Sequence, residues 1–243
     1  MHLPPTSARP HGIVPAVPDA IQRSIERYGA DAICGALGPM LTQERIARID
    51  SVLAQRLASV VTIVEDTYDP HNAAATIRTT EAIGLQELHV VEPELRFSAA
   101  KGVTRGAHKW IDLRRWPRAE DAVAALHARG FRVYATLPGA THSIDDVDVT
   151  TPIAVAFGNE HSGLTAEAIA ACDGSLGVPM QGFTESFNLS VTVALAMRTI
   201  AQRRRAALGV PGDLDDERRR ALRARWFALS IRGVVGILER LLS

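Results

Sequence analysis

The stretch VPMQGFTESFNLSVTVALA, from Val178 to Ala196, predicts a short apolar strand joined to an apolar helix by a loop of small and polar residues. The expected strand, Gly177 to Met180, contains Pro179, which cannot donate an amide hydrogen to a central ladder and suits a strand end or a bend. Ser186 and Asn188 stand where the helix should begin. Free amide groups at a helix start favour an anionic or polar ligand. The pattern fits both a ligand-binding loop and a simple capped helix after a turn.

Two earlier segments show the same order of a buried strand, a polar loop and a helix. Residues 152–157 (PIAVAF) predict a buried strand that ends in the loop GNEHSG, residues 158–163. Residues 60–65 (VVTIVE) predict another strand, followed by DTYDPHN and a helix that contains Arg78. In α/β proteins small molecules bind beyond the carboxyl ends of parallel strands. Glu160 is therefore expected to supply a carboxylate at the mouth of such a crevice.

The rest of the chain alternates predicted strands and helices. This alternation is typical of an α/β fold with a mostly parallel sheet and helices on both faces. Helices are expected near Asp19–Leu37 and Thr42–Leu57, and the C-terminal region is expected to be helical with a break at residues 209–212. Further strands are expected at Leu88–Val91, Lys109–Leu113, Phe131–Thr136 and Ser175–Val178, and a helix at Ala119–Arg129, which Gly130 ends.

Length and composition are compatible with one substantial core and helical appendages, because the chain has 243 residues and 47% hydrophobic content. We expect an N-terminal extension at 1–58, partly helical, an α/β domain at 59–207 and a basic helical extension at 208–243. No apolar stretch is long enough for a membrane span or a signal peptide, which predicts a cytoplasmic protein. Cys34 and Cys172 are far apart and outside any metal-binding motif, so we expect reduced thiols and no metal.

The formal net charge is zero, but the charges are unevenly distributed. From Arg198 to Ser243 the chain has eleven arginines and five acidic residues. The planar guanidinium group matches phosphate, which predicts contact with an RNA or DNA backbone. The alternative is a solvated helix face with local acidic partners at residues 213–217. Our hypothesis is that four arginines bind phosphates without reading sequence: Arg203, Arg204, Arg218 and Arg219.

Three segments, in this order and at these separations, resemble the signature motifs of the TrmH branch of the SPOUT methyltransferases. They are DPHNAAATIRTTEAIG (residues 69–84), FGNEHSGL (157–164) and VPMQGFTESFNLSVTVA (178–194). The resemblance covers roughly residues 42–205. In addition, TRGAHKW (104–110) is similar to the SxGxHKW segment of the tRNA guanosine 2′-O-methyltransferases that modify the conserved guanosine of the D-loop. The arginine-rich C-terminal helices are similar to theirs as well.

The resemblance implies a C-terminal trefoil knot whose loops hold S-adenosyl-methionine in a bent shape, and a homodimer whose interface completes the active site. It implies methyl transfer to a ribose 2′-hydroxyl of tRNA, with RNA contacts at Arg105, His108 and Lys109. The family's polar active-site positions correspond to Asn72, Arg78, Glu160, Ser186 and Asn188. Its cofactor-binding positions correspond to Thr136, Phe157, Gly158, Asn159, Val178, Met180, Phe187 and Asn188.

The chemistry leaves two roles open for Arg78. A ribose hydroxyl is a poor nucleophile until its proton is withdrawn, so the site must align the reactants and assist deprotonation. The family proposal makes Arg78 the base, helped by a substrate phosphate. Because a neutral guanidine is very rare at neutral pH, a cationic clamp that lowers the hydroxyl pKa is the alternative. In either role we expect Arg78 to be essential.

Other interpretations remain open at this stage. Asn72 can simply cap the first core helix, and Glu160 can be an ordinary loop carboxylate. His71 and His161 are expected to have structural or surface roles. The alternative functions are methylation of ribosomal RNA and non-catalytic RNA binding; a nicotinamide dehydrogenase is disfavoured because no GxGxxG follows the first strand. Trp110 and Trp226 are expected to be core residues.

Overall fold

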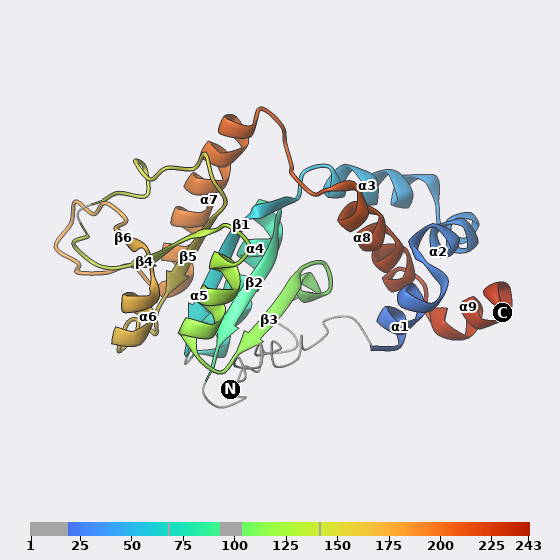
Figure 1. The fold of residues 1–243 in the computed structure, drawn as a ribbon, viewed down its shortest axis with the longest axis horizontal. Coiled ribbons are helices and arrows are strands. Elements are labelled where there is room, and N and C mark those ends of the chain that lie inside the picture. The colour runs from blue at the N-terminus through green and yellow to red at the C-terminus, as the bar shows by residue number, and fades with distance from the viewer. Residues whose placement is uncertain (1–18, 68, 93–103, 141) are drawn as a thin grey trace, which may run out of the picture.

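The computed structural model describes residues 19–67, 69–92, 104–140 and 142–243. The expectations for residues 1–18 lie outside this part of the chain. Its centre is a six-stranded sheet in the order β3-β2-β1-β5-β4-β6, and every neighbouring pair is parallel (Figure 1). The strands are β1 (Leu57–Glu65), β2 (Leu85–Val91), β3 (Asp112–Trp116), β4 (Arg132–Thr136), β5 (Ile153–Phe157) and β6 (Gly174–Leu176).

Helices cover both faces of the sheet, so the expected fold class is confirmed. Consecutive residues of a strand point to opposite faces, and in β5 Val155 belongs to one core cluster while Ala154 belongs to the other. The Val155 side is covered by α4 (Pro70–Ile83) and α7 (Leu189–Leu208). The Ala154 side is covered by α5 (Ala119–His127) and α6 (Ala166–Ala171).

The strand order puts a change of direction at the centre of the sheet. In the sheet, β2 and β3 lie on one side of β1, and β5, β4 and β6 lie on its other side. Such a switch point leaves a crevice beyond the carboxyl ends of the strands, where α/β proteins bind ligands. The loops that follow β1 and β5 meet at this point.

The segments after β4 and β6 run side by side beyond the sheet. Ser143 forms a parallel bridge with Gly177, and the Gly177 amide donates to the His142 carbonyl at 2.8 Å. The Ile144 amide donates in turn to the Gly177 carbonyl at 3.1 Å. These two segments, which are distant in the sequence, therefore lie side by side close to the expected cofactor loops. The trefoil knot itself stays a prediction.

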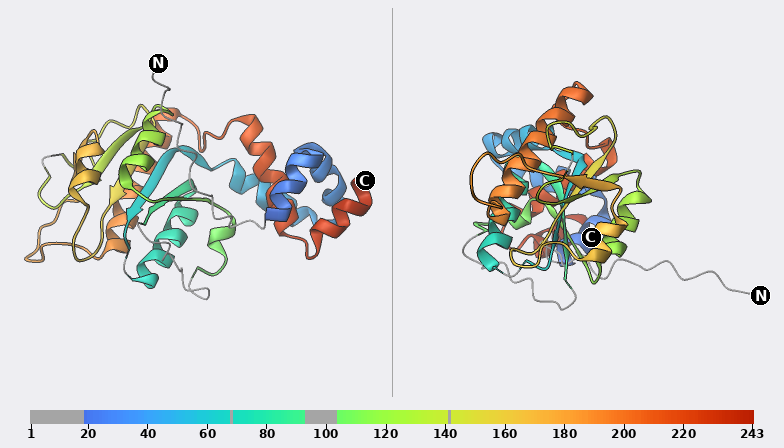
Figure 2. Two further views of the ribbon diagram at one scale, coloured as in Figure 1. Left: turned by 60° about the horizontal axis from the view of Figure 1, so that its bottom comes forward. Right: turned by 90° about the vertical axis from the view of Figure 1, so that its left-hand side faces the viewer.

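In the described part of the chain, five helices pack together beside the sheet, three that precede it in the sequence and two that follow it. We call them the helical body. Its members share one buried core that includes Ile33, Leu53 and Trp226. Figures 1 and 2 show these helices packed together beside the sheet, with the N-terminal and C-terminal helices in contact. They are α1 (Asp19–Tyr28), α2 (Ala30–Leu37), α3 (Gln43–Leu53), α8 (Asp216–Leu229) and α9 (Val234–Leu242).

The sequence predicted two separate extensions, whereas their described parts pack as one body. The expected core positions of two tryptophans explain part of this packing. Trp226 of α8 is fully buried, and the ring of Trp110 meets it edge-on with 5.7 Å between centroids. The domain division at 1–58, 59–207 and 208–243 remains a prediction, but the first and third parts depend on each other for burial of their apolar faces.

A buried charge cluster joins the helical body to the sheet. Glu87 of β2 has no exposed surface, and the guanidinium groups of Arg129 and Arg218 contact its two carboxylate oxygens. We call Glu87 and its partners His89, Arg114, Arg129 and Arg218 the Glu87 cluster. Burial acts to raise the pKa of Glu87, but the bonds from His89 and Arg129 and the charges of Arg218 and Arg114 hold it well below its usual value.

The cluster also fixes the tautomer of His89. The Trp116 indole N–H donates to His89 Nδ1 at 3.1 Å, so Nδ1 is an acceptor and carries no proton. The proton is therefore on Nε2, which donates to Glu87 at 3.2 Å. Burial lowers the pKa of His89, which agrees with a neutral ring.

Several expected boundaries differ from the structure. Gly29, with φ 81°, separates α1 from α2 within the single helix expected at Asp19–Leu37. The helix expected to reach Leu57 ends at Leu53, and β1 begins at Leu57 instead of Val60, because Leu57 pairs with Leu85. The strand expected at Lys109–Leu113 is partly the turn η2 (Ala107–Lys109), and β3 follows it.

The strand expected at Gly177–Met180 is a loop, since β6 ends at Leu176. The helix expected to end at Ala201 continues to Leu208, and Gly209 ends it in a left-handed conformation. The break expected at residues 209–212 is confirmed.

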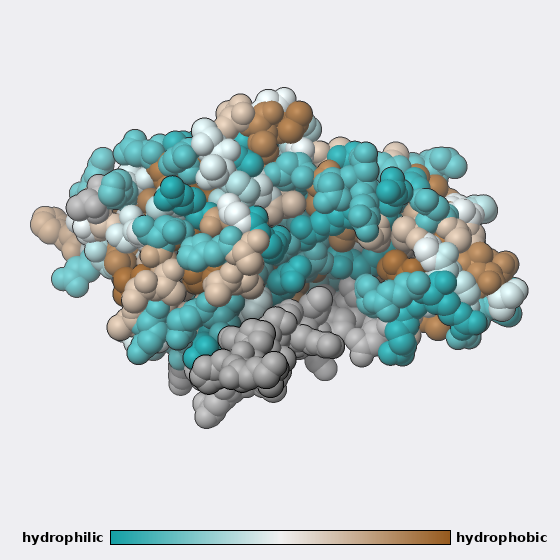
Figure 3. All heavy atoms as spheres, viewed as in Figure 1, coloured by the Kyte–Doolittle hydropathy of each residue, from teal (hydrophilic) through white to brown (hydrophobic). Residues whose placement is uncertain are grey.

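The surface of the described residues is mainly hydrophilic on the face shown in Figure 3, where apolar residues form separate small patches. Val210 after α7 and Leu241 on α9 are among the exposed apolar residues. None of the helices in the described part of the chain has the length and apolar character required to cross a bilayer. In the same part, no three His, Cys, Asp or Glu residues lie where they could hold a metal ion.

Candidate active site

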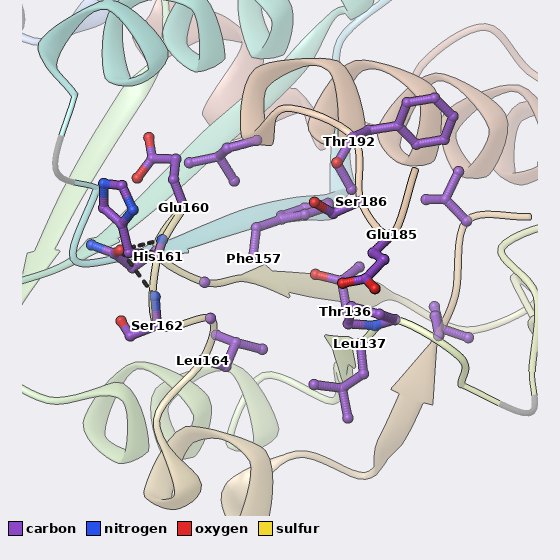
Figure 4. Close-up of a pocket in the computed structure, with 18 of the residues that line it drawn as sticks. Thr136, Leu137, Phe157, Glu160, His161, Ser162, Leu164, Glu185, Ser186 and Thr192 are labelled. Atoms are coloured by element: carbon purple, nitrogen blue, oxygen red, sulfur yellow. Dashed lines mark hydrogen bonds between the residues drawn. The ribbon is translucent and has the colours of Figure 1, made fainter. Parts of the chain in front are cut away.

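A cavity of about 500 Å³ lies beyond the carboxyl ends of β4, β5 and β6 (Figure 4). Thr136, Phe157 and Leu176 are the last residues of these three strands, and each contributes to its wall. The volume lies within the range typical of small-molecule sites. The other lining residues are Leu137, Pro138, Gly158, Asn159, Glu160, His161, Ser162, Gly163, Leu164, Ile169, Val178, Met180, Glu185, Ser186, Phe187, Leu189 and Thr192.

The loop GNEHSG folds into a compact turn around the side chain of Asn159. Its Oδ1 accepts the amide hydrogen of His161 at 2.8 Å, and its Nδ2 donates to the carbonyl of Asp66 at the end of β1. Asp66 has a positive φ of 46°, which is unusual for a residue other than glycine and is common at functional sites. The Asn159 side chain therefore shapes the loop.

Gly158 is required by the same turn. A Cβ atom at this position would lie 2.1 Å from the backbone of both Gly163 and Leu164, a separation that no real side chain tolerates. The loop thus closes on itself only with glycine at its first position.

The opposite end of this loop is held by a residue that the sequence analysis did not single out. Both carboxylate oxygens of Glu65, the last residue of β1, accept hydrogen bonds of 2.8 Å from Thr165, one from its amide and one from its hydroxyl. The Thr165 hydroxyl also caps α6 by accepting from the Ala168 amide. The only signal in the sequence is a carboxylate at the end of an otherwise apolar strand.

The third loop combines the two interpretations offered for it. Asn188 caps α7, since its Oδ1 accepts from the Ser190 amide at 2.9 Å and from the Ser190 hydroxyl at 2.7 Å. Immediately before the cap, Ser186 and Phe187 line the cavity. The segment is therefore both a capped helix and a wall of the pocket. Asn188 does not itself belong to the described residues that line the cavity.

Asn72 and Glu160 meet although they are far apart in the sequence. Asn72 Nδ2 donates to Glu160 Oε1 at 2.6 Å, and the Asn72 side chain is almost completely buried. The alternative role of Asn72 as a helix cap is wrong, because Asp69 caps α4 by accepting from the His71 amide at 2.8 Å. Arg78 lies further along α4 on its exposed side and is not part of the described cavity wall.

The Thr104–Trp110 segment forms a turn between the sheet and the helical body. Arg105 is exposed and has a φ of 44°, a second positive value at a residue other than glycine. His108 Nδ1 lies 3.0 Å from the Thr104 hydroxyl, and its pKa is lowered by burial and by the charge of Lys109. Arg105 and Lys109 project into solvent, where RNA can reach them.

The four arginines expected to bind phosphates do not form one exposed group. Arg204 is only 6% exposed and donates at 2.8 Å to both the Ser59 hydroxyl and the Val149 carbonyl, so its assignment to RNA is corrected to a core role. The assignment of Arg218 to RNA is also corrected, to an ion-pairing role, because it pairs with Glu87 and with Asp112 at 3.0 Å. Arg203 donates to a backbone carbonyl and is partly buried, whereas Arg219 is exposed.

An apolar stripe follows the cavity along α7. Val191 and Leu195 of α7 are four residues apart and are 43% and 42% exposed, and Phe187, just before the helix, is 39% exposed. Residues with this spacing lie on one side of a helix. Phe183, on the loop before α7, is fully exposed as well. These four residues, which we call the α7 stripe, are the apolar surface next to the pocket.

Residues 59–198 match the sequence pattern of the SpoU rRNA Methylase family. The chain belongs to the SpoU rRNA methylase family. The matched residues run from within β1 to the middle of α7 and include every wall of the cavity. The resemblance to the TrmH branch is thereby confirmed.

Relatives within this family carry a more specific name. A tRNA (guanosine(18)-2′-O)-methyltransferase of Borreliella burgdorferi is 36% identical over 172 residues, which are 70% of this chain and 79% of that protein. One from Thermus thermophilus is 38% identical over 170 residues, which are 70% of this chain and 87% of that protein. The crystal structure of the A. aeolicus TrmH/SpoU tRNA modifying enzyme is 26% identical and superposes with a TM-score of 0.69, covering 78% of this chain and 98% of that chain.

Proposed function

We propose that this family member transfers a methyl group from S-adenosyl-methionine to the ribose 2′-hydroxyl of a D-loop guanosine in tRNA. The observation that carries the proposal is the cavity, because all of its described lining residues fall within the stretch that matches the family, and relatives of this chain are named for this activity. The rRNA alternative finds less support, since relatives of similar length are tRNA enzymes.

The cavity fits the cofactor on its own chemistry. An adenine ring requires an apolar wall with backbone polar groups at its edge, and Leu137, Val178 and Met180 provide the apolar surface. The hydroxyl of Thr136 donates to the Ala156 carbonyl, so Thr136 meets a ligand through its backbone and methyl group. Phe157, Gly158, Asn159 and Phe187 complete this wall. The bound cofactor supplies an electrophilic methyl group.

The residues around the Asn72–Glu160 pair would position the ribose. The 2.6 Å bond orients the Glu160 carboxylate at the rim of the cavity, and Ser186 offers a hydroxyl from the facing loop. Arg78 supplies a permanent positive charge on the neighbouring helix. As a clamp it stabilises the developing alkoxide, and as a transient base it accepts the proton; both roles require it close to the 2′-oxygen. Asn188 caps the amino end of α7.

The exposed α7 stripe supports a homodimer. An exposed apolar surface of this kind marks an interaction site, and one of its members, Phe187, also lines the cavity. A second copy packed on α7 would cover the stripe and bring a second set of polar residues toward the site. The trefoil knot and a cytoplasmic location belong to the same proposal.

Methyl transfer to unmodified tRNA tests the proposal. Purified protein is incubated with labelled S-adenosyl-methionine and a tRNA transcript, and the methylated ribose is mapped by its block to alkaline cleavage. We expect one label at the D-loop guanosine, and none in a transcript that has 2′-deoxyguanosine there. Label found only in ribosomal RNA that is supplied in a parallel reaction, or in no RNA, would contradict the proposal.

A further inference from the structure

The charged groups of the cavity are of one sign. Among the described residues that line it are two carboxylates, Glu160 and Glu185, and no lysine or arginine; His161 is the remaining ionisable group. The resemblance pointed to Glu160 but not to Glu185. A cavity with this lining attracts cations more strongly than neutral molecules.

The two carboxylates have different surroundings. Glu160 accepts the Asn72 amide at 2.6 Å, and Figure 4 shows its carboxylate turned away from Phe157. Glu185 lies on the loop before α7, and in Figure 4 its carboxylate projects from this loop toward the side of the cavity that bears Thr136. Glu185 is therefore the carboxylate positioned to act on a molecule inside the cavity.

The methyl donor and its product differ by one charge. S-adenosyl-methionine carries a sulfonium, an ammonium and a carboxylate, so its net charge is +1 at neutral pH. S-adenosyl-homocysteine has a neutral thioether and no net charge. The two molecules also differ by the methyl group itself, but their hydrogen-bonding groups are the same. A charged side chain therefore distinguishes them through the sulfonium charge.

We propose that Glu185 is a specificity-determining residue that makes the cavity prefer the cationic methyl donor to the neutral product. The inference rests on the proposed function, because it assigns a role within the same site. Each turnover removes the charge that Glu185 attracts, which weakens retention of the product and favours its replacement by a new donor. The side chain is exposed to solvent, which limits the size of the effect.

Calorimetric titration of both ligands, without RNA, tests the inference. Glu185→Gln removes the charge and keeps the shape of the side chain. We expect S-adenosyl-methionine to bind roughly threefold to fivefold more weakly, as is typical of a partly screened charge pair, while S-adenosyl-homocysteine changes less than about twofold. Glu185→Asp should keep most of the preference. Glu167→Gln, which removes an exposed carboxylate of α6 outside the cavity wall, is the matched control and should change neither affinity.

Salt provides a second readout. In the unmodified protein, the ratio of the affinity for the donor to the affinity for the product should decrease as the ionic strength is raised. In Glu185→Gln, this ratio should stay constant. Equal weakening of both ligands by Glu185→Gln, or no change in either, would overturn the inference while leaving the proposed methyl transfer intact. If the unmodified protein bound neither ligand, the proposed function would fail and this inference with it.

Discussion

The pocket edge of the sheet and its junction with the helical body use charged residues in opposite ways. At the junction, Glu87 is buried and contacts three arginines from different parts of the chain. At the pocket edge, Arg78 and Glu185 remain exposed. An arginine or glutamate in the sequence therefore predicts little about its role until its neighbours in space are known. Changes at the junction should affect stability, and changes at the pocket edge should affect chemistry.

The largest effect is expected for Glu87→Gln, which removes the buried carboxylate that Arg114, Arg129 and Arg218 share. We expect the free energy of unfolding to fall by about 3–5 kcal/mol at pH 7. Because the pKa of Glu87 is lowered in the folded state, its stabilising contribution is present above the pKa of an unfolded glutamate, about 4.3, and is lost as the pH falls further.

Urea unfolding at pH 7 and pH 3 checks this prediction. The difference between the unmodified protein and Glu87→Gln should be large at pH 7 and should narrow at pH 3. Glu239→Gln, at an exposed position of α9, is the control for loss of a carboxylate. An equal difference at both pH values would show that the ion pairs are not its source.

The next largest effect is expected at Arg78, on the pocket side of the comparison. Both Arg78→Ala and Arg78→Lys should lower the methyl transfer rate by about 100-fold, the size typical of a missing group in acid–base or electrostatic catalysis. Donor affinity and the unfolding free energy should stay unchanged. Arg132→Ala, at the amino end of β4 and thus at the far edge of the sheet, should keep full activity. Near-normal turnover in either Arg78 variant would exclude both proposed roles.

A smaller effect is expected for Asn72→Ala. The variant removes a 2.6 Å bond to a carboxylate, and we expect roughly a tenfold loss of methyl transfer. Asn72→Asp should be worse, because it places two carboxylates next to each other. Rates measured with saturating donor would separate this positioning role from binding. If Ala and Asp gave equal rates, the hydrogen bond to Glu160 would not matter for the reaction.

The smallest effect is expected for the exposed arginines of α8. Replacing Arg219 and Arg220 by alanine should lower the slope of log affinity for tRNA against log salt by about 1 for each phosphate that the protein no longer neutralises. Arg204→Ala should instead lower stability and leave the slope unchanged, because its guanidinium is in the core. A slope that changed with Arg204 but not with Arg219 and Arg220 would reverse the comparison.

Local signals in the sequence predicted the sheet well. An apolar run such as PIAVAF identifies a central strand because both of its faces are buried, and β5 has the expected bounds. Strand ends and turns were less accurate, since the start of β1 at Leu57 depends on its pairing with Leu85. Long-range pairing of this kind leaves no local signal.

The candidate site shows the same limit. The motif resemblance identified the three loops and their polar residues, but it did not distinguish side chains that face the cavity from those that build the loops. Asn159 organises its loop by a bond to Asp66, which is distant in the sequence. Arg204 is satisfied by Ser59 and Val149, which are equally distant. An arginine run alone cannot reveal such partners.

The shared core of the helical body has a consequence for synthesis of the chain. Helices α1 to α3 are made first, but α8, which covers them, follows only after the whole sheet has been translated. At typical elongation rates this delay is on the order of ten seconds. During that interval the apolar faces of Ile33 and Leu53 lack the partner that buries them in the finished protein. The helical body can thus be completed only after the sheet has been synthesised.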